Sequence, residues 1–230
     1  MKGMVTGMMI RLSRLMVVGC AVFAVACEAN ASPSLVFNTG VDGLGVPLPD
    51  GTVGDPHYIL TSVPSGSSAI QVRTSAGEFP IGPWIGDDSL SAWIRPNNPY
   101  NGLVNDPAGV CDFQTTFDLT GLNPATVVLI GQWATDNAGL DILINGTSTG
   151  FTAAGFGGWS SFTLSSGFIA GVNTLDFIVN NLSGDTGNPT GLRVEMSGTG
   201  DPNSQIPEPV SFVLLGAGLV ALGMLRRRKI

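Results

Sequence analysis

One short stretch of this chain carries the side-chain types that carbohydrate sites use. Trp84 and Trp93 offer flat aromatic faces, and Asp87, Asp88 and Arg95 offer planar hydrogen-bonding groups. An aromatic face packs against the apolar side of a sugar ring, while carboxylate and guanidinium groups bind its hydroxyls. Two roles fit the tryptophans: a sugar-binding surface, or anchors of a hydrophobic core.

A further tryptophan, Trp159, follows Gly157 and Gly158. Successive glycines favour a loop, so we expect Trp159 at a loop tip and include it among the candidate carbohydrate-binding residues. Trp133 ends a continuous apolar run that begins at residue 126, and we expect it in the core.

The chain offers little for catalysis. His57 is its only histidine, and Asp55, two residues earlier, could orient it for acid–base work. No serine-nucleophile elbow, H-E-x-x-H motif or paired-carboxylate signature accompanies this pair. Cys111 needs a histidine partner to act as a nucleophile, and we expect it to be a small core residue. The sequence therefore predicts a non-catalytic protein, with a secreted hydrolase as a less favoured alternative.

Charge restricts the partners of residues 32–206. This part of the chain contains 15 aspartates and glutamates, three arginines and no lysine, which gives it a net charge of −12. Such a surface repels the phosphates of nucleic acids and anionic lipids. We therefore exclude nucleic acid as a partner.

The N-terminus has the three parts of a secretory signal peptide. A basic start is followed by an apolar stretch over residues 15–26, and Ala29 and Ala31 form an A-x-A cleavage site. Cleavage after Ala31 assigns residues 1–31 to the signal peptide. The residues before Cys20 and before Cys27 also resemble a lipoprotein box, so lipidation of either cysteine is an alternative.

Short apolar stretches bounded by turn residues fill the region from residue 32 to residue 198. Residues 113–119 alternate with a period near two, and Asn145-Gly146 is a type I′ hairpin signal. No stretch of this region combines a 3.6-residue period with capping signals. The pattern predicts an all-β domain: an antiparallel β-sandwich of roughly eight to ten strands, arranged as a jelly roll.

The stretch from Gln132 to Ser197 resembles the C-terminal half of galactose-binding-like β-sandwich modules. The resemblance is carried by a strand over residues 133–136, by the Asn145-Gly146 hairpin and by the turn over residues 171–175. It implies the same sandwich fold. It does not settle the ligand, because members of one fold carry many functions.

The same resemblance implies a structural calcium near the ends of the domain. Asp42, Asp50, Asp55 and Glu195 are the oxygen donors available there. Hard cations take several oxygen ligands, often carboxylates. No D-x-D-x-D-G loop is present, so the alternative is that the aspartates are solvated turn residues.

The C-terminal 24 residues have three parts in a fixed order. Pro207, Glu208 and Pro209 come first, an apolar run over residues 210–225 follows, and residues 226–229 are basic. A helix of 16 residues spans roughly 24 Å, slightly less than a bilayer core of about 30 Å. The basic end should stay cytoplasmic. A polar linker over residues 199–206 precedes this tail.

This tail resembles the PEP-CTERM sorting signal of Gram-negative bacteria. The resemblance implies transient anchoring of the exported protein in the inner membrane, cleavage near Pro207 by an exosortase, and release to the cell surface or extracellular matrix. Families with this tail are associated with exopolysaccharide and biofilm matrix, so extracellular polysaccharide is the expected partner. An ordinary tail anchor, and a purely structural surface protein without a specific ligand, are the alternatives.

Overall fold

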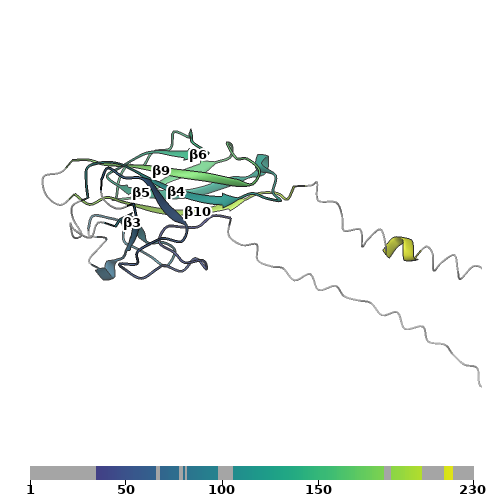
Figure 1. The fold of residues 1–230 in the computed structure, drawn as a ribbon, viewed down its shortest axis with the longest axis horizontal. Coiled ribbons are helices and arrows are strands. Elements are labelled where there is room, and N and C mark those ends of the chain that lie inside the picture. Colours follow the sequence, from purple (N-terminus) through teal and green to yellow (C-terminus); the bar gives the residue numbers. More distant parts are fainter. Residues whose placement is uncertain are drawn as a thin grey trace, which may run out of the picture. The chain divides into compact units, whose positions relative to one another are not determined.

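The computed structural model describes residues 35–65, 68–77, 80, 82–97, 106–183, 188–203 and 215–219. Within residues 35–203, the described part of the chain forms two five-stranded antiparallel sheets, two short 3-10 turns and no α-helix (Figure 1). The predicted all-β antiparallel sandwich is therefore confirmed.

Each sheet takes strands from along the whole domain. In spatial order, the first sheet contains β1 (Tyr58–Ser62), β4 (Gly109–Asp118), β9 (Val172–Asn181), β6 (Ala138–Ile144) and β7 (Thr147–Ser148). The second sheet contains β2 (Ile70–Arg73), β3 (Trp93–Pro96), β10 (Gly191–Thr199), β5 (Val128–Asp136) and β8 (Ser160–Leu164). The 3-10 turns are η1 (Ser75–Gly77) and η2 (Pro124–Thr126).

Successive strands mostly alternate between the two sheets. From β3 to β10 the chain changes sheet at every step except the β6–β7 hairpin, while β1 and β2 each add an outer strand. This alternation agrees with the expected jelly roll. Its consequence is that neighbours within a sheet, such as β5 and β10, come from distant parts of the sequence.

The β6–β7 hairpin forms where the sequence predicts it. Asn145 and Gly146 have φ values of 50° and 76°, the positive values that a type I′ turn requires at both central residues. The Asn145 side chain also donates to the carbonyl of Gly167 and to the Oδ1 atom of Asn173. These bonds attach the hairpin to the turn that precedes β9.

Aromatic side chains from both sheets meet in the core. The Phe177 ring lies 5.7 Å from the Trp133 ring and 6.2 Å from the Phe162 ring, measured between centroids. Cys111 is buried in the same core, and burial raises the pKa of its thiol to about 12. The expected core positions of Trp133 and Cys111 are confirmed.

Most of the predicted terminal segments lie outside the described residues. These are the signal peptide, the sorting residues Pro207, Glu208 and Pro209, and much of the predicted membrane helix, of which residues 215–219 are described and helical. Among the described residues, no helix is both long and apolar enough to cross a membrane. The terminal assignments stay predictions.

Candidate binding groove

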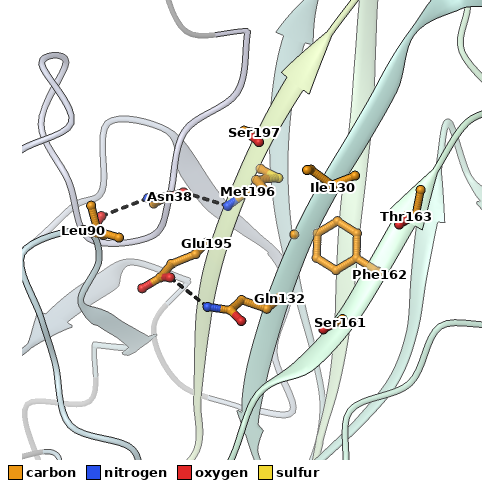
Figure 2. A pocket seen from close by; sticks show the side chains of 11 residues that line it. Asn38, Leu90, Ile130, Gln132, Ser161, Phe162, Thr163, Glu195, Met196 and Ser197 are labelled. Atoms are coloured by element: carbon orange, nitrogen blue, oxygen red, sulfur yellow. Dashed lines mark hydrogen bonds between the residues drawn. The ribbon is translucent and has the colours of Figure 1, made fainter.

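A groove of about 580 Å³ lies on the outer face of strands β10, β5 and β8 (Figure 2). We use "the groove" for the space lined by Asn38, Leu90, Ile130, Gly131, Gln132, Ser161, Phe162, Thr163, Glu195, Met196 and Ser197.

Strand register arranges the outward side chains of the groove in two rows. In the first row Glu195 and Ser161 lie on either side of Gln132, and in the second row Ser197 and Thr163 lie on either side of Ile130, each through direct strand pairing. Because side chains alternate between the two faces of a strand, the intervening side chains of Phe162 and Met196 belong to the core. The face between the sheets is therefore apolar, and the groove face is mostly polar.

Glu195 has both carboxylate oxygens engaged. Its Oε2 atom accepts a hydrogen bond of 2.9 Å from Gln132, and its Oε1 atom accepts one of 2.8 Å from the Ser91 hydroxyl. Arg193 also contacts Oε1, at 3.3 Å, and the Glu195 side chain is 12% exposed. The carboxylate is thus held in place by Gln132, Ser91 and Arg193.

Arg193 connects the groove to the loop that precedes β3. Its guanidinium forms an ion pair with Asp88 at 3.0 Å, donates from Nε to Ser91 at 2.7 Å and donates from Nη1 to the carbonyl of Gly86. The same guanidinium lies over the ring of Trp159, 4.9 Å from its centroid. Asp88 and Trp159, both predicted site residues, therefore meet at Arg193.

An aromatic cluster covers the sheet face beside the groove. The rings of Trp84 and Trp93 are 4.4 Å apart, and Trp84 stacks on Phe156 at 5.5 Å. The indole N–H of Trp93 donates to the carbonyl of Ile85. Trp93 is 0% exposed and Trp84 is 8% exposed. Of the two roles considered for these tryptophans, the structure shows the core role, because neither ring presents a face to a ligand.

The remaining predicted carbohydrate residues are placed apart. Arg95 forms a buried ion pair with Asp106 at 2.6 Å. Asp87 accepts two hydrogen bonds from Ser75 and so holds η1. Trp159 is half-buried and lies between a turn and β8. The expectation that it lies at the tip of a loop is therefore wrong.

The four candidate calcium ligands do not gather. Asp42 accepts hydrogen bonds from the backbone of its own turn. Asp50 accepts a hydrogen bond from the backbone of Thr74 and forms an ion pair with Arg73. Asp55 accepts hydrogen bonds from three backbone N–H groups, and Glu195 lies in the groove. Within the described ranges, no three or more His, Cys, Asp or Glu side chains form a group that could hold a metal ion. The alternative considered from the sequence, a solvated turn residue, fits Asp42, which bonds within its own turn. It does not fit Asp50 and Asp55, which bond to Thr74 and Gly40 in other segments, and Asp55 is buried.

Asp55 and His57 do not form an acid–base pair. The Asp55 carboxylate accepts from the backbone N–H of His57 and not from its ring. The imidazole stacks on Phe37 at 3.6 Å, and its Nε2 atom lies 3.0 Å from the carbonyl of Asp42. Burial is the main cause of a raised pKa at Asp55. Both residues therefore hold together the loops that precede β1.

Several groove residues escaped the sequence analysis. Gln132, Ser161, Thr163 and Ser197 belong to no binding motif in the sequence. Their alternation with apolar residues indicates an exposed face on each strand. Only the pairing of the strands shows that these faces form one surface.

Comparison with known proteins gives no family. No family model matches the chain, and no curated protein matches it. Among solved structures, the chain is similar to the CBM36-1 domain of a multidomain xylanase from the hindgut metagenome of Trinervitermes trinervoides, with 16% identity over 60% of this chain and 94% of that domain. The TM-score is 0.28, which is too low to support an argument about fold or ligand.

Proposed function

We propose that this protein is an exported, non-catalytic bacterial protein whose β-sandwich binds extracellular polysaccharide in the groove. One observation carries the proposal: two rows of mostly uncharged, hydrogen-bonding side chains lie side by side on three paired strands, around an exposed apolar residue, and Glu195 is the one charged member. Ligand sites combine apolar contact with a few placed polar groups, and a sugar chain presents both kinds of surface.

Each row offers a different part of this contact. Gln132 and Ser161 present an amide and a hydroxyl that bind sugar hydroxyls. In the second row, Ile130 is 54% exposed and provides apolar contact between the hydroxyls of Ser197 and Thr163. Trp159 lies next to this surface and is held there by Arg193.

The groove supports binding better than hydrolysis. Most glycoside hydrolases place two carboxyl groups on either side of the bond they cleave. Among the residues that line the groove, Glu195 is the only acid, and its oxygens are taken by Gln132, Ser91 and Arg193. A secreted hydrolase is therefore the weaker proposal.

The route to the cell surface rests on the sequence of the two ends. The signal peptide over residues 1–31 supports export, and the tail from Pro207 supports membrane anchoring followed by exosortase cleavage. The product is a surface or matrix protein associated with exopolysaccharide or biofilm matrix.

A matched pair of variants tests the binding site. The full chain is purified in detergent, and its retention is measured by affinity electrophoresis in gels that contain the exopolysaccharide of the host. Gln132→Ala should weaken retention about tenfold, because it removes a central polar group of the groove. Gln114→Ala is the control: Gln114 also donates to a carboxylate, that of Asp176, but it lies on β4 in the other sheet.

Two results would contradict the proposal. Equal retention of the two variants would place any binding outside the groove. If the folded parent chain is not retained at all, a purely structural surface role replaces polysaccharide binding.

A further inference from the structure

We infer that the groove selects neutral polysaccharide and rejects chains that carry carboxylate, sulfate or phosphate groups. This inference rests on the proposed function and names the ligand class of the same site. It follows from which polar groups of the groove remain free, and from where the positive charges of the domain are placed.

The free hydrogen-bonding groups of the groove are all uncharged. Gln132 uses its amide nitrogen for Glu195, and its carbonyl oxygen makes no hydrogen bond within the described part of the chain. The hydroxyls of Ser161, Thr163 and Ser197 likewise donate to no group in the described ranges, and all three residues are exposed. An amide carbonyl accepts and a hydroxyl both donates and accepts, which suits the hydroxyls of a sugar.

Within the described part of the chain, no basic side chain lines the groove. The nearest cation, Arg193, is 1% exposed, and its N–H groups already bind Asp88, Glu195, Ser91 and the carbonyl of Gly86. The carboxylates of Asp88 and Glu195 share this one guanidinium, so the cluster of these three residues carries a net negative charge, and Glu195 is its member that lines the groove. An anionic sugar would approach Glu195 without a partner of its own and would be repelled.

The other arginines of the domain are also withdrawn from the surface. Arg73, Arg95 and Arg193 are the only basic residues between positions 32 and 206, and they are 7%, 1% and 1% exposed. Arg73 pairs with Asp50, and Arg95 pairs with Asp106. The domain thus combines a net charge of −12 with no exposed Lys or Arg in its described part. Its long-range field also repels anionic polymers.

The wall of the groove is fixed before a ligand arrives. Asn38 donates to the carbonyl of Leu90 at 3.0 Å and accepts from the backbone of Met196 at 2.8 Å (Figure 2). These bonds hold the loop before β1 and the loop before β3 against β10. A preformed site loses less entropy on binding, so weak neutral contacts suffice to retain a long chain.

Pairs of polymers that share a backbone and differ in charge test the inference. The full chain in detergent is run in gels containing hydroxyethylcellulose or carboxymethylcellulose, and dextran or dextran sulfate. Retention by at least one neutral polymer, and at least tenfold weaker retention by its charged partner, is the expected result. Equal or stronger retention by the charged partner overturns the ligand class but leaves polysaccharide binding standing. If neither these polymers nor the host exopolysaccharide retains the folded chain, both the inferred ligand class and the proposed function are wrong.

A second comparison separates the groove from the overall charge. Glu195→Gln removes one of the two carboxylates at Arg193, so retention by the charged polymer should rise about threefold. Asp201→Asn removes the same charge from an exposed position outside the groove and should have little effect. An equal rise in both variants would show that the rejection comes from total charge and would overturn the role of the groove.

Discussion

At the scale of single residues, the domain places its positive charges inside. An arginine at a protein surface pairs weakly with carboxylates because water screens both charges. The buried Arg95–Asp106 pair instead depends on completing its hydrogen bonds, and a second Asp106 oxygen accepts from the backbone of Thr190. The sequence shows that residues 32–206 contain three arginines, and the structure shows that all three are buried and form ion pairs within the domain.

Asp136 lies near the Arg95–Asp106 pair, but no basic side chain forms an ion pair with it in the described part of the chain. It is 2% exposed, and its Oδ1 atom has no hydrogen-bond partner within the described part of the chain. Burial, and then the negative charge of Asp106, raise its pKa to about 7. The carboxylate form is therefore unfavourable in the folded state.

The first prediction concerns this residue. Because the folded pKa lies above the unfolded value of 3.8, stability is present at low pH and is lost as the pH rises from about 4 to about 7. A pKa moved from 3.8 to about 7 corresponds to roughly 4 kcal/mol as an upper limit. Asp136→Asn should raise the free energy of unfolding at pH 8 by up to that amount and much less at pH 4, measured by urea denaturation.

The control for this prediction is Asp201→Asn, since Asp201 is exposed. It should leave the difference between pH 4 and pH 8 as in the parent. If Asp136→Asn changed the free energy of unfolding by the same amount at pH 4 and at pH 8, the proposed effect of a buried carboxylate would be contradicted.

At the scale of elements, β5 is the strand on which the groove depends. It pairs with β10 along one edge and with β8 along the other. Gly131 lies at the middle of β5, and a Cβ atom there would meet Phe162 at 2.5 Å and the backbone oxygen of Glu195 at 2.6 Å. The three strands can approach only because this position has no side chain.

The second prediction follows from this contact. Gly131→Ala should lower the free energy of unfolding by about 1–3 kcal/mol, because a backbone atom cannot move aside as a flexible side chain can. It should also weaken polysaccharide retention by displacing Glu195. Gly158→Ala is the matched control, since nothing lies within 4 Å of the added atom. Thermal and chemical denaturation measure both, and equal stability of the two variants would argue against the close packing.

At the scale of the whole molecule, we propose that the two ends of the chain direct the domain to the cell surface. The third prediction is that the mature protein from the host cell surface or culture medium begins at Ser32 and lacks residues 226–230. Intact-mass spectrometry measures both ends. Replacing Pro207, Glu208 and Pro209 together by alanine should leave the full C-terminus on the protein and keep it in the membrane fraction. A mature wild-type form that retains Arg226 would instead support an ordinary tail anchor.

The sequence by itself determined the all-β class, the Asn145-Gly146 hairpin and the core positions of Cys111 and Trp133. These features depend on local patterns: alternation along a strand, the conformational preferences of turn residues, and the low polarity of continuous apolar runs. Tertiary structure alone decided the binding surface. Gln132 and Glu195 are 63 residues apart and meet only because β5 and β10 pair in one register. It also decided that Trp93 is covered, because an aromatic cluster formed by distant loops packs over its strand.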